Sequence, residues 1–487
     1  MVLLGEQKRP VGMIRNRKMG DEFWAERKEV LAEWPTGKEV DLDEAVAYHK
    51  SMPPEKVWST RLTRARQNGE TLLITGMGHT TIEQQIKLLQ TVEPVADILG
   101  TSPDSLTRAH HFHVIQKEIE RSLQLGISTL NGFPIVNHGV MGIRKLINAI
   151  SKPIQLRYGA PDMRIINEIA YAGGYTADSG DGLYNFWNMN SKEPIEKVLA
   201  NHQYLHRLIG IYEERGAPIS ASVLGLYGCG IPPSLNIAAQ LTQVLMMAEQ
   251  GVKEIVFHHH AHGNLAQDIA GVRAFYKLVG YYLETLGYTG MRFNTNAGLA
   301  LAKYPHDVGG SYMVVAFNCL LARLCGAQIV DVRTISEAKT IPSAQDIFVT
   351  FEAGRMAVNL FKNQGVAADE ELVADEQTMI EMEVRSILDR VFDLGDGDVV
   401  IGTLKAVEQG VLDNPFSSHN SVACKVMGIK DDRGAVRYLD HGNLPFGREI
   451  IEFHKERISR REKLSGRKAD YETVVEDLSA IARGGLL

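Results

Sequence analysis

Residues 231–257, IPPSLNIAAQLTQVLMMAEQGVKEIVF, predict one helix followed by one strand. Ser234 can cap the start of the helix, because its hydroxyl can accept a hydrogen bond from the first turn. Gly251 can end the helix in a left-handed conformation. The branched run 254–257 then predicts a buried strand. The apolar residues expected to share one helix face are Ile237, Ala238, Leu241, Val244, Leu245 and Ala248.

The same strand–helix pair recurs between residues 61 and 341, at intervals of roughly 25 to 45 residues. Such alternation is typical of parallel α/β proteins. The number of units and the absence of a G-x-G-x-x-G phosphate loop favour a closed (β/α)8 barrel of the TIM type over an open doubly wound sheet. The expected strands are 71–75, 95–100, 127–131, 154–158, 219–226, 254–259, 291–296 and 327–333, with 173–178 as a ninth candidate.

Three parts are expected along the chain. Residues 1–60 form an N-terminal arm with two short helices, separated by the helix-ending sequence WPTG at 34–37. Residues 61–365 form the barrel. Residues 366–487 form an α+β extension that begins with an acidic helix and ends with a pair of charged helices.

Composition excludes several classes of protein. The chain has 487 residues, a net charge of −7 and a pI near 6.2, which give no reason to expect nucleic acid as a partner. Its 4 cysteines include no CxxC pair, as expected of a reduced compartment. The N-terminus lacks the features of a signal peptide, and no apolar run is long enough to span a membrane. We therefore expect a cytoplasmic protein that is not bound to a membrane.

A barrel of this type places its site at the carboxyl ends of the strands. Arg157 occupies such a position, where a guanidinium can bind a carboxylate through two hydrogen bonds or pair with a nearby acid such as Asp162. The aromatic segment 184–187 can form a wall for a ligand or a packed loop. Glycines are frequent at these strand ends and allow close approach of the backbone.

The sequence His258-His259-His260-Ala261-His262 raises the question of a metal site, since imidazoles in H-x-H spacing can share a metal ion. In metal-dependent hydrolase barrels the ligand set starts at the first strand, where this chain has Gly76-Met77-Gly78. We therefore assign no metal. His202 and His206 are expected to be surface or packing residues.

Several motifs occur in one order along nearly the whole chain, from about residue 24 to 487. They are WPTGKEVDL (34–42), LNGFP (130–134), GAPD (159–162), AGG (172–174), IPPS (231–234), GN with QDIA (263–270), IGT (401–403) and GNLPF (442–446). In this order the chain resembles the epsilon (E) subunit of adenosylcobalamin-dependent glutamate mutase, also called methylaspartate mutase.

The resemblance implies a (β/α)8 barrel isomerase that interconverts glutamate and 3-methylaspartate by a radical rearrangement. The cofactor, adenosylcobalamin, is shared with a separate small cobalamin-binding subunit. That subunit carries a D-x-H-x-x-G motif whose histidine ligates cobalt, and this chain has no such motif. A homodimer of this chain within a heterotetramer is expected.

The resemblance also implies which residues bind the substrate, and the family pattern is only partly kept. Arg108 and Arg157 match family arginines that bind the substrate carboxylates, whereas the third such arginine falls on Gly76. A glutamate that contacts the substrate amino group falls on Ser179.

Two family tyrosines of the substrate site fall on Asn185 and Met189. A shift of one residue lets Tyr184 replace the first tyrosine. Asp178 or Asp181 is a candidate to replace the missing glutamate.

On the cofactor side, Gly78 and Asn131 match positions near the corrin and the adenosyl group. Glu337 matches the glutamate that holds the ribose, and Arg333 replaces a lysine beside it. These departures predict that the radical chemistry is kept while the substrate is a less charged carboxylic acid. A cobalamin-independent, metal-dependent barrel enzyme and a non-catalytic homologue remain as alternatives.

Overall fold

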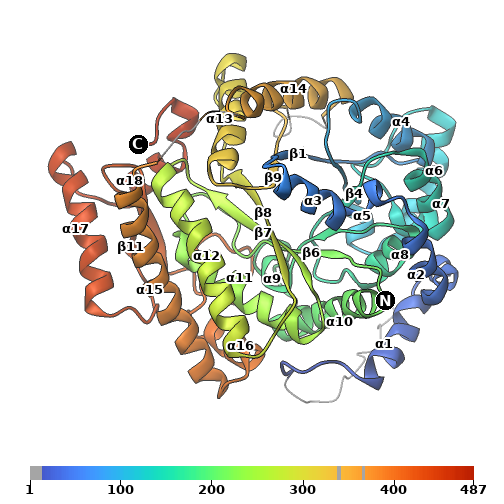
Figure 1. Cartoon of the computed structure of the whole chain (residues 1–487), viewed down its shortest axis with the longest axis horizontal. Helices are drawn as coiled ribbons and strands as arrows, with labels where there is room; N and C mark the ends of the chain where they lie inside the picture. The colour runs from blue at the N-terminus through green and yellow to red at the C-terminus, as the bar shows by residue number, and fades with distance from the viewer. Residues whose placement is uncertain (1–13, 337–341, 363, 365–367) are drawn as a thin grey trace, which may run out of the picture.

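A closed ring of parallel strands forms the centre of the molecule (Figure 1). The computed structural model describes residues 14–336, 342–362, 364 and 368–487. Within these residues the strands of the ring are β1 (Leu72–Ile74), β2 (Gly76–Met77), β3 (Leu99–Thr101), β4 (Ile154–Arg157), β5 (Asp178–Ser179), β6 (Ser220–Val223), β7 (Glu254–Ala261), β8 (Arg292–Leu299) and β9 (Ile329–Asp331).

Strand pairing closes the ring. One arc has the order β1-β9-β8-β7-β6 and the other the order β2-β3-β4-β5. Only Thr75 separates β1 from β2, so these two short strands occupy one position of the barrel. A bridge between Ala177 and Ser220 joins β5 to β6. The expected (β/α)8 barrel is confirmed.

One predicted strand is wrong. Residues 127–131 lie in the connection between α6 (Phe112–Leu125) and α7 (Ile135–Ala149), and the fourth strand position belongs to β5. The Thr129 amide donates to Thr80 Oγ1 at 3.0 Å, and the Thr129 hydroxyl donates to the Glu118 carbonyl at 3.0 Å. The hydroxyl groups of Thr80 and Thr129 thus make hydrogen bonds in place of those between neighbouring strands. These bonds hold residues 127–131 in a loop.

The helix that opened the sequence analysis is α11 (Pro233–Glu249), and Gly251 follows it with φ +94° as predicted. Ser234 does not cap it. Its hydroxyl lies in the core, 2.8 Å from Tyr438 Oη and hydrogen-bonded to Glu383. The other helices around the barrel are α4 (Ile82–Val92), α5 (Ser105–Arg108), α8 (Arg164–Gly173), α9 (Gly182–Asn188), α10 (Ile195–Glu214), α12 (Leu265–Thr285), α13 (Val308–Leu324) and α14 (Ala344–Leu360).

The N-terminal arm leads into a helix that covers the end of the barrel where the strands begin. α1 (Asp21–Ala32), η1 (Pro35–Glu39), α2 (Leu42–Ser51) and η2 (Pro54–Lys56) lead to α3 (Trp58–Gln67). Trp58, Leu62 and Ala65 of α3 are fully buried. They form one apolar cluster with the strand residues Leu72, Ile74, Ile98, Ala177, Val256 and Ile329.

The positions of these cluster residues show which side chains further along each strand also face the barrel interior. Side chains two positions apart on a strand lie on the same face. His258 follows Val256 by two positions, Ser179 follows Ala177, and Asp331 follows Ile329. The interior of the barrel therefore changes from apolar to polar toward the carboxyl ends of the strands.

The C-terminal extension packs on one side of the barrel, beside α11 and α12 (Figure 1). Its elements are α15 (Glu370–Gly395), α16 (Val399–Glu408), β10 (Met427–Lys430), β11 (Val436–Asp440), α17 (Arg448–Ser465), α18 (Tyr471–Leu478) and η3 (Ile481–Arg483). The acidic helix and the charged helix pair are as predicted. No helix in the described ranges has both the length and the apolar character needed to cross a bilayer.

Candidate active site

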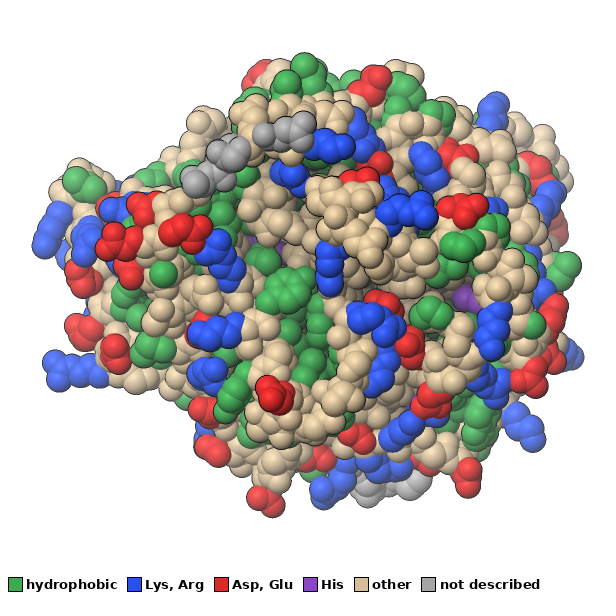
Figure 2. All heavy atoms as spheres, in the orientation of Figure 1, with side chains coloured by type: hydrophobic (Ala, Val, Ile, Leu, Met, Phe, Trp, Pro, Cys, Tyr) green, Lys and Arg blue, Asp and Glu red, His purple; other side chains and the backbone are tan. Residues whose placement is uncertain are grey.

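A polar cavity of about 260 Å³ opens at the carboxyl ends of the strands. Charged side chains of both signs are mixed over the face of the molecule shown in Figure 2, which forms no single basic or acidic surface there. The cavity is lined by predicted residues and by others. The predicted residues among them are Gly76, Arg108, Arg157, Ser179, Tyr184, Met189 and Arg333.

Arg108 enters the cavity from α5, a short helix that Asp104 holds in place. The Asp104 carboxylate accepts hydrogen bonds from the amides of Leu106 and Thr107 at 2.9 and 3.0 Å. Arg108 is half-buried, and its Nε is buried without a hydrogen-bond partner. It forms no ion pair with any residue that the structure describes. This guanidinium is therefore available to an anion in the cavity.

Arg157 points inward from β4 and is already paired. Its Nη2 lies 2.5 Å from Oδ2 of Asp331 on β9, and its Nη1 donates to Gln155 Oε1 at 2.8 Å. The alternative pairing with Asp162 is wrong, because Asp162 pairs with Arg164 instead. Asp331 was not among the predicted site residues. The register of β4 and β9 around the barrel brings it to Arg157, and a sequence contains no direct signal of that register.

Gly76 brings no side chain to the cavity, which it lines. A β-carbon at this position would overlap Ser102 Oγ at 2.5 Å and would lie 3.8 Å from Arg157 Nε, so a side chain here requires Ser102 to move. Ser179, on β5, accepts a hydrogen bond from the Tyr158 amide at 3.2 Å and lines the cavity. The position of the third arginine therefore carries no cation.

The aromatic segment after β5 divides between the cavity and the core. Tyr184 and Met189 line the cavity. Phe186 and Trp187 are fully buried in helix α9, so this part of the segment packs in the core and does not form a loop. Asn185 is not brought to the cavity, because its amide donates to His202 Nε2 at 2.8 Å.

Neither Asp178 nor Asp181 lines the cavity. Asp178 faces α8, where its Oδ2 accepts hydrogen bonds from Tyr171 Oη at 2.6 Å and Asn167 Nδ2 at 2.9 Å. Burial raises the pKa of Asp178 to about 7. Asp181 caps α9 and accepts a hydrogen bond from the Leu224 amide at 2.6 Å, and burial raises its pKa to about 6. Among the residues that the structure describes, the carboxylate that lines the cavity belongs to Asp331.

Two neutral polar side chains on neighbouring strands complete the wall. His258 on β7 and Asn296 on β8 are paired in register, and both are almost fully buried. The Nε2 of His258 and the Oδ1 of Asn296 have no hydrogen-bond partner. Burial lowers the pKa of His258 well below its usual value, so its imidazole is neutral. The alternation of inward-facing positions from Val256 was the signal that could have found His258.

The rest of the histidine run makes contacts within the protein. His259 lies 3.3 Å from Asp268 of α12, and His260 lies 3.1 Å from the Leu224 carbonyl. His202 and His206 are buried packing residues, as predicted. In the part of the chain that the structure describes, no group of three or more His, Cys, Asp or Glu side chains is arranged to hold a metal ion.

The residues predicted on the cofactor side lie at the mouth or beyond the described ranges. Gly78 packs against other backbone, since a β-carbon there would lie 2.5 Å from the Ser102 carbonyl oxygen. Asn131 is exposed, and its Oδ1 accepts a hydrogen bond from the Ser105 amide at 3.0 Å. The Arg333 guanidinium lies 5.1 Å from the centre of the Tyr227 ring. Glu337 lies outside the described residues.

A parallel (β/α)8 barrel with a polar, ligand-sized cavity at its mouth defines a barrel enzyme. The family model described as the methylaspartate mutase E chain matches residues 52–487. The chain therefore belongs to the methylaspartate mutase E chain family, and it is a mutase, that is, an isomerase.

Curated relatives agree over almost their full length. The chain is 38% identical over 478 residues to the glutamate mutase epsilon subunit of Desulfitobacterium hafniense, covering 97% of this chain and 99% of that protein. It is 33% identical over 477 residues to the glutamate mutase epsilon subunit of Escherichia coli O157:H7, covering 97% and 99%. The corresponding protein of Halobacterium salinarum is 32% identical over 481 residues, covering 98% and 99%.

Among solved structures, the tryptophan synthase A-subunit of Pyrococcus furiosus aligns with a TM-score of 0.33 and 14% identity, covering 59% of this chain and 98% of that one.

Proposed function

We propose that this chain is the substrate-binding subunit of an adenosylcobalamin-dependent carbon-skeleton mutase that acts on a carboxylic acid less charged than glutamate or 3-methylaspartate. The observation that carries this proposal is the difference between two arginines in one cavity. Within the described residues Arg108 has no anionic partner, whereas Arg157 is neutralised by Asp331. Arg108 is thus available to a substrate carboxylate and Arg157 is not, while Arg333, which also lines the cavity, lies against the Tyr227 ring.

Arg108 would orient the substrate. A hydrogen bond that involves a charged group contributes about 1.5–3 kcal/mol, and a planar guanidinium can make two such bonds to one carboxylate. A second carboxylate would lose its hydration near Gly76 without gaining a cation there, which is costly in a buried site. An uncharged polar group can instead bond to Ser179, His258 or Asn296.

The rim residues support a cofactor role at the mouth. Arg333 lines the cavity beside Tyr227, so it can donate to a ribose hydroxyl or a ring nitrogen next to the substrate position. Asn131 is exposed and lies outside the cavity lining. The cofactor, when bound, supplies the radical that removes a hydrogen from the substrate. The chain's own contribution is to fix the substrate carboxylate at Arg108 and to exclude water with the barrel wall. Glu337 is proposed to hold the ribose, by family resemblance.

A second polypeptide is required by this proposal. The sequence has no D-x-H-x-x-G motif to ligate cobalt, so a small cobalamin-binding subunit would supply it. We propose a cytoplasmic heterotetramer containing two copies of this chain. The metal-dependent alternative gains no support from the described histidines, since they form no group of ligands.

The test is reconstitution with the native cobalamin-binding subunit and adenosylcobalamin. A panel of amino and 2-substituted carboxylic acids is screened for an electron-spin-resonance radical signal and for tritium exchange from the adenosyl carbon. We expect a signal with a monocarboxylic acid and a much weaker one with glutamate. Turnover of glutamate as fast as any other acid would contradict the proposed substrate. Absence of exchange with every acid would favour a non-catalytic homologue.

A further inference from the structure

A carboxylate of the chain itself occupies the second guanidinium of the cavity. Asp331 Oδ2 lies 2.5 Å from Arg157 Nη2, although the two residues come from different arcs of the barrel. Their side chains are 27% and 13% exposed, and both line the cavity. The contact therefore lies inside the candidate active site and not on the outer surface.

Both partners are held by further hydrogen bonds. Gln155, which accepts from Arg157, donates through Nε2 to the Asp178 carbonyl at 2.8 Å. The Asp331 carbonyl accepts from Asn318 Nδ2 at 2.9 Å, and β9 pairs with β1 at this residue. Such support keeps the ion pair in one geometry, as expected of a preorganised site.

The ion pair faces the cavity. Arg157 and Asp331 both line it, beside Gly76, whose backbone is exposed to it. A second carboxylate in the cavity would therefore meet Asp331 at Arg157. Two carboxylates beside one guanidinium repel each other and one of them loses its partner, so the charge of Asp331 keeps a second carboxylate away.

We propose that Asp331 is a specificity-determining residue, a built-in carboxylate that occupies Arg157 and restricts the cavity to substrates with one carboxylate. This inference rests on the proposed function, since it names the class of acid that the same site takes. Rejection of a wrong substrate by an adverse charge is a common source of specificity. The unpartnered neutral atoms of His258 and Asn296 agree with a substrate whose remaining polar group is uncharged.

The test measures equilibrium binding to the full chain without cofactor. Two matched pairs of probes differ only in charge, L-glutamate with L-glutamine and glutarate with its monoamide. We expect the wild-type chain to bind each amide at least tenfold more tightly than the matching diacid. Asp331→Asn keeps the shape and removes the charge, so it should reduce that preference at least tenfold, mainly by strengthening binding of the diacids. Asp331→Ser provides a second, smaller neutral variant.

Asp97→Asn is the matched control. Asp97 forms an ion pair of 2.7 Å with Arg355, in a groove outside the cavity. The Asp97→Asn variant should be slightly less stable than the wild-type chain, and its preference for amides should be unchanged. Thermal unfolding of all variants shows whether they are folded.

Three results would overturn the inference. The first is a wild-type chain without preference between acid and amide, and the second is weakening of all four probes by the same factor in both Asp331 variants. Alternatively, the variants could lose the two amino acids and keep the two glutarate probes, which would show that Asp331 binds the substrate ammonium group. Failure of the proposed function is distinguishable, because the radical signal is measured only after reconstitution with the cobalamin-binding subunit.

Discussion

Gly100 on β3 lies directly against the side chain of Arg157 on β4. A β-carbon at position 100 would overlap Arg157 Cδ and would lie 2.5 Å from the Thr75 carbonyl oxygen. Glycine at this position is what allows Arg157 to turn into the barrel and reach Asp331.

We expect Gly100→Ala to destabilise the chain by about 1–3 kcal/mol, the usual cost of inserting an atom into a packed interior. The measurement is the free energy of unfolding in urea. Gly280→Ala in α12 is the control, because nothing lies within 4 Å of a β-carbon there. That variant should be stabilised by about 0.5–1 kcal/mol. Equal effects of the two substitutions would show that Gly100 is not packed against Arg157.

Arg108→Gln should weaken binding of a monocarboxylic acid by about 1.5–3 kcal/mol, because a charged hydrogen bond is lost. That loss corresponds to a roughly 10- to 150-fold rise in Kd. Arg121→Gln on α6 is the control, since its side chain is 62% exposed and pairs with Glu118. If Arg108→Gln binds the acid as well as the wild-type chain, the substrate carboxylate is held elsewhere.

Asp178 gives a pH-dependent prediction. Burial raises its pKa from 3.8 to about 7, so in this range the folded chain binds a proton that the unfolded chain has released. The wild-type chain therefore gains stability from this group at low pH and loses that stability as the pH rises from about 4 to about 7. In Asp178→Asn this contribution is absent, while the hydrogen bonds from Tyr171 and Asn167 can be kept.

The difference in unfolding free energy between Asp178→Asn and the wild-type chain should grow by up to about 1.4 kcal/mol for each pH unit in that range. Buried histidines affect both proteins equally and cancel in the difference. A difference that does not change with pH would contradict a raised pKa at Asp178.

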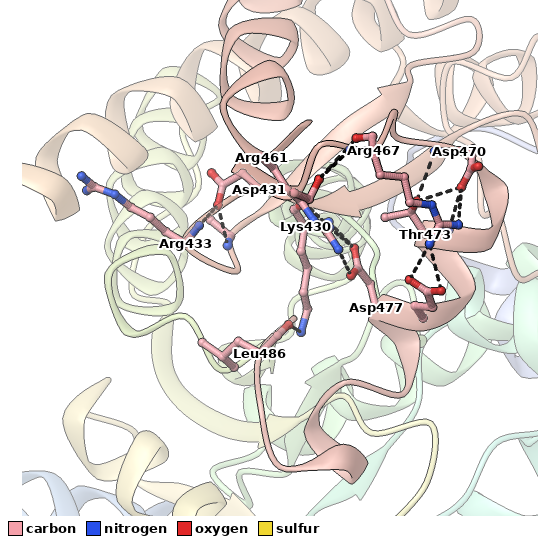
Figure 3. Close-up of polar contacts among 12 residues, drawn as sticks. Lys430, Asp431, Arg433, Arg461, Arg467, Asp470, Thr473, Asp477 and Leu486 are labelled. Atoms are coloured by element: carbon pink, nitrogen blue, oxygen red, sulfur yellow. Dashed lines mark hydrogen bonds and ion pairs between the residues drawn. The ribbon is translucent and has the colours of Figure 1, made fainter. Parts of the chain in front are cut away.

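The C-terminal extension contains two kinds of ion pair that should differ in strength (Figure 3). Asp477 of α18 is buried and accepts from the Lys430 amide at 2.8 Å and from Arg461 at 2.7 and 2.8 Å. Arg467 is 42% exposed and pairs with three surface acids. Asp477→Asn should cost about 3 kcal/mol, because it leaves a partly buried guanidinium without its counter-ion.

Arg467→Gln should change stability by less than about 1 kcal/mol, as is usual for exposed pairs. Both variants are compared by thermal unfolding. A larger loss for Arg467→Gln than for Asp477→Asn would mean that the surface network, and not the buried pair, holds α18 in place.

The barrel could be predicted from the sequence because buried parallel strands are short branched runs between helices. The prediction failed at residues 127–131, where Leu130 is buried but Ile127 is 60% exposed. The Thr129 amide donates to Thr80 Oγ1 and the Thr129 hydroxyl donates to the Glu118 carbonyl of α6, in place of bonds to a neighbouring strand. The true fourth strand, β5, has only two residues, Asp178 and Ser179. The ninth candidate, 173–178, is therefore the one that reaches this position, and it overlaps β5 only at Asp178 because α8 extends to Gly173.

The site could be predicted only in part, for a different reason. Arg157 stands at the end of β4 and Arg108 on α5, in the connection that follows β3, where chemistry is expected in a barrel. Their different states depend on Asp331, which lies 174 positions from Arg157 in the chain. Contacts across a barrel depend on strand register, and no local pattern encodes that register.

The burial of Trp58, Leu62 and Ala65 has a consequence for the order of events in catalysis. With α3 covering the amino ends of the strands, a small molecule reaches Arg108 by way of the mouth. Under the proposed function, the cobalamin-bearing polypeptide docks at the same mouth. The acid and that polypeptide then use the same opening of the barrel. A tightly docked complex would trap its substrate, and product could depart only when the two polypeptides move apart.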